Sequence, residues 1–534
     1  MFRTFFILLL ALAASVPAFA ADPPILGAEW TYDSREGIVG QPVPFPDANS
    51  ARAVLITLGS GKVRMIDSAG RMVREFQLDE AASAAALAGD LSANGRIQIV
   101  ALDTWGSIYC FAEDGTRLWK YARESNEGSY RQPVLADVDG DKTLEILVTD
   151  SRGRLLVLDA AGRLKLELHV TDYRLSPPAV ADLDGDGAAE IIFGTEDKEV
   201  YCFDARGELR WMATADGRFG RTLPLIADLD NDGRYEVYLS SAFVHAHPGV
   251  FALDARDGRL LWKAEAKLQS YHSLAAVDLD GDRRPELLFG DKSTSLFAVR
   301  QGGGALWSVQ LGGRGIFFAP AAARLDAAGA VAILTVVRGA GPEGHSLYAL
   351  DAAGKVLQGV PLPGGGTASP ALVRFSAQGE LKLLAVGGAG KLVCFRLRQD
   401  PQKAQILWAG LRNDANLSGY LPGANGQPAG QPLPALAPLP APEARFAWHG
   451  TNSLGLKQVP KVGTAAVRLV RPDKSIQTTV LRFGPGLAPP QMRYEAAFSG
   501  NYSLEVRWTG SGQLPPPEHY SVNVPADGWK DADR

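Results

Sequence analysis

Four stretches of the chain repeat one acidic pattern, with carboxylates at positions 1, 3, 5 and 9 of nine residues. Carboxylates packed this closely repel one another unless a cation lies among them. Ca²⁺ takes six to eight oxygen ligands, which three Asp side chains, a backbone carbonyl at position 7 and a two-oxygen Glu can supply. The pattern therefore predicts about four structural Ca²⁺ ions. The expected ligands are Asp137, Asp139, Asp141, Thr143, Glu145, Asp182, Asp184, Asp186, Ala188, Glu190, Asp228, Asp230, Asp232, Arg234, Glu236, Asp278, Asp280, Asp282, Arg284 and Glu286.

The flanking residues distinguish these loops from EF-hands. An EF-hand loop has its last acid at position 12 and lies between two helices. Here the last acid is at position 9, and the flanks are short apolar runs such as Pro133–Ala136 and Ile146–Val148, which are typical of strands. The loops are therefore expected inside β-hairpins. Asp and Gly also favour metal-free turns, which is the simpler alternative.

The N-terminus has the form of a secretory signal. Residues 1–20 contain Arg3, an apolar run over 5–14 and a small-x-small cleavage site at Ala18–Ala20. The apolar run is too short to span a membrane. We expect a mature chain without a transmembrane span, exported to the periplasm, the cell surface or the medium. The formal net charge of −5 lies largely in the acidic loops and says little about partners, and no basic run suggests a nucleic-acid partner.

A second repeated feature is a turn followed by a strand that often carries Trp. It recurs at roughly 45–51 residues, the length of one four-stranded propeller blade. Residues 21–420 are therefore predicted to form an all-β propeller of eight blades, with seven as the alternative. The strand of Trp30 is one more than eight blades need if Trp408 is also counted, and it could close the ring as the outer strand of the last blade.

The four acidic loops resemble FG-GAP (VCBS-type) repeats, the blades of integrin α-subunit propellers. The resemblance covers about residues 38–410 and implies calcium loops between the first and second strands of consecutive blades, with the ligand face opposite them. The Gly-x-x-x-Trp strands are also similar to the repeats of PQQ-type quinoprotein propellers.

The C-terminal part has a different composition. Residues 421–444 are rich in Pro, Ala and Gly and are expected to form a semi-extended linker. Alternating apolar residues return over 445–534, which predicts a small β-sandwich of immunoglobulin-like class.

The segments leading into the first strands are rich in aromatic and basic residues. In a propeller these segments surround the mouth of the central channel, on the face opposite the acidic loops. Arg and aromatic side chains are enriched at binding hot spots, so we expect a ligand rim here, although packing between blades is the simpler interpretation. The rim residues are Tyr130, Arg131, Tyr173, Arg174, Phe219, Arg221, Tyr271, His272, Arg314 and Phe317.

Other chemistry has weaker support. Cys110, Cys202 and Cys394 occupy equivalent repeat positions and are expected to be small buried strand residues. His245 and His247 are too few ligands for zinc without a third. No catalytic residues are predicted, so the sequence favours a non-catalytic module that binds an envelope or cell-surface protein or glycan. Two enzymes on the same fold remain alternatives, a polysaccharide lyase and a PQQ-type dehydrogenase, but the adjacent cysteines of the latter are missing.

Overall fold

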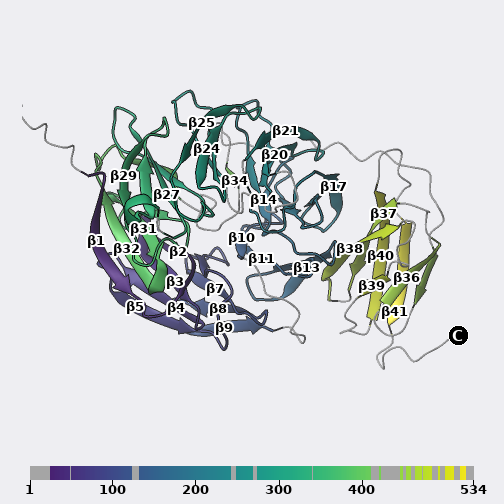
Figure 1. Ribbon diagram of the computed structural model, residues 1–534. Coiled ribbons are helices and arrows are strands. Elements are labelled where there is room, and N and C mark those ends of the chain that lie inside the picture. Colours follow the sequence, from purple (N-terminus) through teal and green to yellow (C-terminus); the bar gives the residue numbers. More distant parts are fainter. Residues whose placement is uncertain are drawn as a thin grey trace, which may run out of the picture.

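The architecture is known from a computed structural model (Figure 1). It describes residues 24–47, 50–122, 132–241, 248–266, 268, 274–339, 341–409, 420–421, 445–448, 453–458, 463–471, 473–483, 491–493, 500–509 and 518–524. These residues form β-strands, turns and two single 3₁₀ turns, η1 (Pro342–Gly344) and η2 (Gly388–Gly390). The predicted all-β class is confirmed. Within the described residues, no helix has the length and apolar character needed to cross a membrane.

Within the described residues, eight antiparallel four-stranded units, called blades one to eight below, follow one another along the chain and form a ring (Figure 1). Blades one to four comprise β2 (Ile38–Asp47), β3 (Ser50–Leu58), β4 (Lys62–Asp67) and β5 (Met72–Gln77); β6 (Leu87–Gly89), β7 (Gln98–Leu102), β8 (Ile108–Ala112) and β9 (Arg117–Tyr121); β10 (Val134–Ala136), β11 (Glu145–Thr149), β12 (Arg154–Leu158) and β13 (Leu164–His169); β14 (Ala179–Ala181), β15 (Glu190–Gly194), β16 (Glu199–Phe203) and β17 (Leu209–Thr214).

Blades five to eight comprise β18 (Leu225–Ala227), β19 (Glu236–Ser240), β20 (Gly249–Asp254) and β21 (Leu260–Glu265); β22 (Ala275–Val277), β23 (Glu286–Gly290), β24 (Ser295–Val299) and β25 (Ala305–Gln310); β26 (Ala321–Arg324), β27 (Val331–Val336), β28 (Leu347–Leu350) and β29 (Val356–Val360); β30 (Ala371–Arg374), β31 (Leu381–Gly387), β32 (Lys391–Leu397) and β1 (Leu26–Asp33). The first strand of each blade is the innermost one.

The N-terminal strand closes the ring. Strand β1 pairs antiparallel with β32, with Trp30 opposite Cys394, and becomes the outer strand of blade eight. The last blade thus joins the two ends of the array, which removes a free sheet edge. Of the two Trp strands that could do this, the strand of Trp30 does.

The strand of Trp408 has a different place. Strand β33 (Gln405–Trp408) pairs antiparallel with β26, the inner strand of blade seven. Strand β34 (Tyr420–Leu421) pairs parallel with β18, the inner strand of blade five. Both therefore lie in the central channel, where Figure 1 shows β34 near the middle of the ring, and Trp408 is fully buried. The chain fills part of its own channel.

Blades pack through buried aliphatic side chains and through a repeated Trp contact. One buried cluster runs from blade one to blade three and another from blade five to blade seven. On the outer strands, Trp Nε1 donates to a turn carbonyl of the next blade, as in Trp119 to Ala160 O (3.0 Å) and Trp307 to Ala352 O (2.8 Å). A Cβ at Gly162 would lie 2.7 Å from the Trp119 ring, so this turn needs glycine. The recurring Trp is thus an inter-blade contact.

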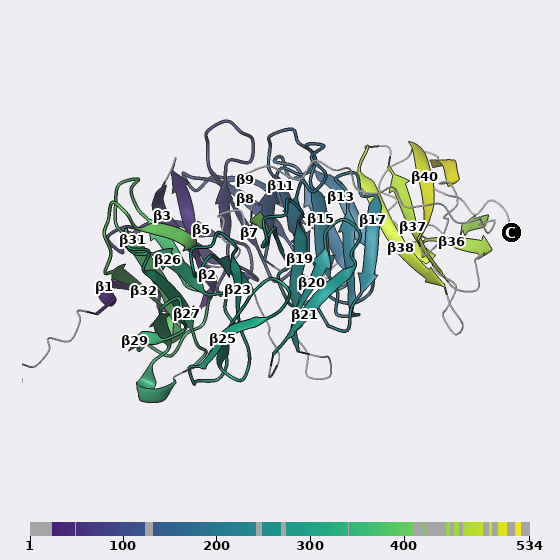
Figure 2. The ribbon, with the colours of Figure 1, turned by 90° about the horizontal axis from the view of Figure 1, so that it is seen from above.

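The C-terminal strands extend the sheet of blade three. Strand β38 (Ile476–Phe483) pairs parallel with β13, and the sheet continues through β37 (Gly463–Val470), β40 (Gly500–Thr509) and β41 (Glu518–Val524). Figure 2 shows this sheet beside the propeller. A second sheet contains β35 (Arg445–Trp448), β36 (Ser453–Gln458) and β39 (Gln491–Arg493). The immunoglobulin-like class of this part stays a prediction, and the predicted signal (1–20) and linker residues 422–444 lie outside the described residues.

Candidate functional site

All four acidic loops join the first strand of a blade to its second strand. In each loop the Glu at position 9 is the first residue of the second strand and pairs with the last residue of the first strand. The pairs are Ala136 with Glu145, Ala181 with Glu190, Ala227 with Glu236, and Val277 with Glu286. The pattern thus has one register in blades three to six, and the buried hairpin fixes the Glu at the base of each loop.

The Asp at position 1 organises the turn. In blade four, Asp182 Oδ1 accepts from Gly185 N (2.7 Å) and Asp182 Oδ2 from Gly187 N (3.1 Å). Blades three and six repeat this arrangement from positions 4 and 6. Position 4 has a positive φ in all four loops, which explains why Gly or Asn occupies it. The Asp at position 1 therefore has a role in the turn whether or not a metal binds.

The Glu at position 9 is buried, and one of its two carboxylate oxygens accepts a hydrogen bond. Glu190 is 3% exposed, and its Oε2 accepts from Leu183 N at 2.9 Å. Glu145 and Glu286 accept the equivalent backbone N–H in their own loops. We expected a Glu with two oxygens on the metal. Here one of its oxygens already accepts a backbone hydrogen bond.

Each loop gathers three carboxylates that could hold a metal ion, with oxygens within 4.8 Å of one another. The groups are Asp137, Asp139 and Glu145; Asp182, Asp184 and Glu190; Asp228, Asp230 and Asp232; and Asp278, Asp280 and Asp282. Positions 5 of blades three and four and position 9 of blades five and six lie outside these groups. In all four loops the position-5 side chain accepts the N–H of position 7, as Asp186 does from Ala188 (2.8 Å). An all-oxygen, acidic donor set suits a hard divalent cation.

Basic side chains approach three of the four loops, a feature that the sequence pattern did not reveal. Lys165 Nζ lies 2.5 Å from Asp139 Oδ2 and 2.9 Å from Glu145 Oε1. Arg210 lies 3.6 Å from Asp184, and Arg300 lies 3.3 Å from Asp280. Lys165 and Arg210 occupy the same bulge position in β13 and β17, where blades five and six have Leu261 and Leu306.

In the described part of the chain, neutral side chains donate hydrogen bonds to the loop of blade five. Gln301 Nε2 donates to Asp230 Oδ2 at 3.4 Å, and Tyr238 Oη donates to Glu236 Oε2 at 2.9 Å. Burial raises the pKa of Glu236 and of Glu190 to about 8, and that of Glu286 to about 7; neighbouring Asp charges act in the same direction. In blade three burial also raises the pKa of Glu145, although Lys165 opposes the shift. Without a cation, Glu190 and Glu236 therefore favour the protonated form at neutral pH.

Adjacent loops are bonded to one another. The position-8 N–H of one blade donates to the position-2 carbonyl of the preceding blade: Leu144 N to Leu91 O (2.9 Å) and Ala189 N to Val138 O (2.8 Å). Asn231 Nδ2 also donates to Arg283 O, which joins the loops of blades five and six. A cation in one loop would therefore stabilise the contact between two blades.

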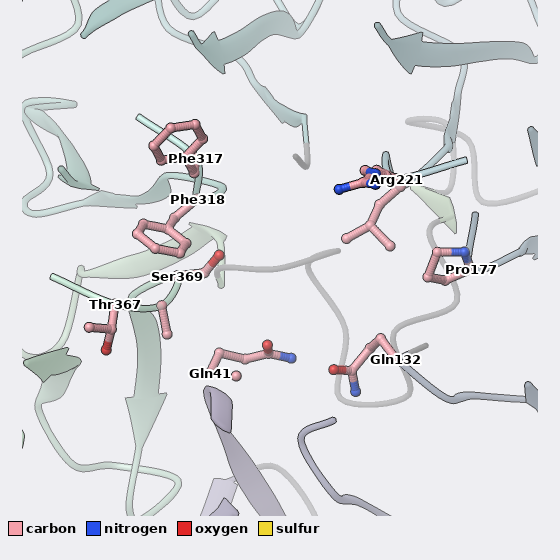
Figure 3. A pocket seen from close by; sticks show the side chains of 11 residues that line it. Gln41, Gln132, Pro177, Arg221, Phe317, Phe318, Thr367 and Ser369 are labelled. Atoms are coloured by element: carbon pink, nitrogen blue, oxygen red, sulfur yellow. The ribbon is translucent and has the colours of Figure 1, made fainter. Parts of the chain in front are cut away.

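A cavity of about 190 Å³ lies at the other end of the first strands (Figure 3). Its lining comes mainly from segments that lead into the first strands: Gln132, Pro177, Arg221, Leu223, Phe317, Phe318 and Thr367–Ser369, together with Gly40 and Gln41 of β2. This is the channel mouth that we expected opposite the acidic loops.

The predicted rim residues divide into three groups. Arg221 and Phe317 line the cavity. Arg174, Tyr173 and Arg314 are described but do not line it, and Tyr173 is 55% exposed. Tyr130, Arg131, Tyr271 and His272 lie outside the described residues.

Phe219 differs from the expectation of a rim residue. It is fully buried, and its ring packs edge-on against Phe251 at 5.3 Å between centroids. For this residue, packing within the propeller is correct and a rim position is wrong. The cavity residues Gln41, Gln132 and Ser369 were not predicted, because single Gln and Ser residues carry no pattern in the sequence.

The predicted cysteine environment is confirmed. Cys110, Cys202 and Cys394 are buried free thiols, and burial raises the pKa of Cys110 and Cys394 to about 12. Such thiols are poor nucleophiles. His245 and His247 lie outside the described residues.

Comparisons with known proteins support the repeat architecture. A family model of PQQ-type repeats, described as outer membrane protein assembly factor BamB, matches residues 183–316. The solved structure of Sqt1 from Saccharomyces cerevisiae is similar with a TM-score of 0.52 and 11% identity, covering 69% of this chain and 98% of that one. No curated protein sequence matches the chain.

Two further solved structures are similar to this chain, also at low sequence identity. BamB from Moraxella catarrhalis matches with 14% identity and a TM-score of 0.48, over 70% of this chain and 100% of that one. The quinohemoprotein alcohol dehydrogenase ADHIIG from Pseudomonas putida HK5 matches with 14% identity and a TM-score of 0.46, over 71% and 77%. The chain is a β-propeller repeat protein. Part of it resembles the PQQ-type repeats of BamB.

Proposed function

We propose that this protein is an exported, calcium-stabilised propeller that acts as a non-catalytic binding module at the cell envelope or surface. The observation that carries the proposal is that the acidic loops and the mouth cavity lie at opposite ends of the first strands. The acidic loops follow the first strands and the mouth cavity precedes them, and each first strand in blades three to six has only three residues. The metal would therefore stabilise the blades at the end with the acidic loops, while the end with the mouth cavity binds a partner.

Calcium is the cation that fits best. The donor set is all oxygen, and an exported protein meets free calcium at levels that weak extracellular sites can bind, about 10⁻⁴–10⁻³ M. The uniform register of the four loops supports the FG-GAP (VCBS) interpretation, and the signal-like N-terminus supports export through a cleaved signal peptide. The description of the matching family model as an assembly factor agrees with a protein partner.

The mouth carries positive charge suited to an anionic partner group, whether on a protein or a glycan. Arg221 Nε lies 3.0 Å from Glu196 Oε1, and Arg174 lies 3.8 Å from the same oxygen. Two guanidinium groups thus share one carboxylate. Arg is effectively always protonated, so the charge persists at physiological pH.

The test is a pull-down from the native envelope with the double variant Arg174→Ala/Arg221→Ala. We expect loss of partner capture with a melting temperature close to that of the wild type. The matched control is Arg71→Ala/Arg163→Ala, which removes two exposed ion pairs on outer turns and should leave capture intact. Equal capture by both variants, or unfolding of the mouth variant alone, would contradict the proposal.

A PQQ-type dehydrogenase is the second candidate, because the family model that matches 183–316 is of PQQ-type repeats. The described channel holds β33 and β34, which leaves less room for a cofactor there, and the three cysteines lie in three different blades. A red-shifted absorbance on addition of PQQ would favour the enzyme. A polysaccharide lyase would be supported by cleavage of a uronate polymer.

A further inference from the structure

Within the mouth cavity, one polar group lacks a partner. Gln41 is 7% exposed, and its Nε2 has no hydrogen-bond partner in the described structure. Leaving a buried donor unpaired is unfavourable, so the fold alone does not account for this side chain. The register of β2 shifts between Val39 and Val43, and Gly40 has a φ of +73°. This bulge directs Gln41 into the channel (Figure 3).

A second amide, that of Gln132, lines the same side of the cavity in Figure 3. Gln132 Nε2 donates to Ala85 O at 3.0 Å. This bond fixes the orientation of the amide, so its carbonyl oxygen points toward Gln41 (Figure 3). The cavity therefore presents one donor and one acceptor on the same side, which is the complement of a peptide group with its C=O and N–H.

The rest of the cavity adds an apolar wall and a positive edge. Phe317 and Phe318 lie on the side opposite Gln132 (Figure 3). Leu223 is 6% exposed and also lines the cavity. Arg221 contributes its guanidinium from blade five, beside Arg174 and Glu196.

The volume limits the ligand. A cavity of 150 Å³ is known to accept benzene, so a space of about 190 Å³ has room for one large side chain. It falls below the usual range of about 300–1,000 Å³ for drug-sized ligands. A single residue with its amide and a terminal carboxylate meets all of these constraints.

We propose that the mouth cavity binds the carboxy-terminal residue of a peptide that ends in a large apolar side chain. The last amide lies between Gln41 and Gln132, the side chain packs on Phe317 and Phe318, and the carboxylate lies toward Arg221. This inference rests on the proposed binding function and names its ligand class.

The test uses fluorescence anisotropy with a labelled hexapeptide that ends in Phe with a free carboxylate. The comparison peptides are its C-terminal amide and a version that ends in Ser. We expect saturable binding of the free acid and at least tenfold weaker binding of both others, because the amide lacks the charge that pairs with Arg221 and Ser lacks the apolar side chain that packs on Phe317 and Phe318. Equal binding of acid and amide by the wild type would overturn the proposal without any variant.

Gln41→Leu is the decisive variant. It should weaken binding of the free acid at least tenfold without lowering the melting temperature, because it removes an unpaired buried donor. The matched control is Gln310→Leu on the exposed face of β25, which should bind as the wild type does. Unchanged binding by Gln41→Leu would overturn the proposal, and the comparison of acid with amide decides the matter if that variant fails to fold.

Competition separates this inference from the proposed function. The free-acid peptide should displace captured envelope protein from the wild type. Capture that resists the peptide would overturn the carboxy-terminal site and leave the binding function standing. Peptide binding without any captured envelope protein would support the site and contradict the broader function.

Discussion

The loops of blades two and four adopt similar turns with different chemistry. In blade two, Leu91 N donates to Gln98 Oε1 at 2.9 Å, and in blade four Leu183 N donates to Glu190 Oε2 at the same distance. Asp90 accepts two loop N–H groups in blade two, as Asp182 does in blade four. The turn therefore needs an Asp at its start and an oxygen acceptor at its end, but no charge at the end.

The difference between the loops lies in buried charge. Blade two closes its turn with a neutral amide that is 9% exposed, whereas blade four buries a carboxyl group at 3% exposure beside two Asp residues. Burying an unpaired carboxylate is unfavourable. The proposed metal sites therefore predict that blades three to six depend on a cation and that blade two does not.

Chelation of calcium should have the largest effect. A ligand at about 20 times its Kd stabilises each site by about 2 kcal/mol, so EDTA should lower the melting temperature by several degrees. Hydrogen exchange should rise in blades three to six and remain unchanged in blade two. The metal sites would be contradicted if calorimetry detected no calcium binding and EDTA left the melting curve unchanged. An equal rise of hydrogen exchange in all blades would contradict the difference between blade two and blades three to six.

The pH dependence in EDTA follows from the raised pKa values. The pKa of Glu190 is 4.5 when unperturbed and about 8 in the folded state, so the folded state binds the proton more tightly than the unfolded state. Its contribution to stability is fully present below about pH 4.5 and is lost as the pH rises through 8. The control is the double variant Glu190→Gln/Glu236→Gln, which lacks these two titrating groups. In EDTA, the melting temperature of the wild type should fall relative to that of the control as the pH rises from 5 to 8. Saturating calcium should flatten this difference.

Sequence patterns predicted the features that repeat. Spacing of the Trp strands and the alternation of apolar runs gave the propeller, the closing strand of Trp30 and the register of the acidic loops. Features that depend on a single contact were not predictable. Strands β33 and β34 enter the channel through pairing with β26 and β18, and Lys165 reaches its loop only because a bulge turns it toward Asp139. The sequence likewise did not distinguish buried Phe219 from the cavity-lining Phe317.

Exchanging the terminal side chains should convert one loop type into the other. Glu190→Gln keeps an acceptor for Leu183 N and removes the charge, so it should stabilise the calcium-free protein at pH 8 by about 1–3 kcal/mol and lose the calcium response of blade four. Gln98→Glu should destabilise blade two by a similar amount at that pH. Denaturant unfolding in EDTA measures both changes. If Glu190→Gln is as destabilising as Glu190→Leu, which removes the acceptor, then the charge is not what separates the two loops.

The smallest expected effect is a change in the calcium affinity of one acidic loop relative to another. Lys165 already neutralises part of the loop of blade three, and its Nζ contacts two of the oxygens that calcium would use. Lys165→Met should therefore strengthen calcium binding in that loop. Since the side chain is 33% exposed, solvent screening limits the gain to about 1 kcal/mol, or roughly fivefold in affinity.

The calcium midpoint for exchange protection of residues 137–145 should fall, while that of 228–236 stays fixed. Arg163→Met, which removes an exposed ion pair with Asp159, is the matched control and should move neither midpoint. A midpoint for 137–145 that rises in Lys165→Met would mean that Lys165 holds the loop open for the ion, so that it assists calcium where we expect it to compete.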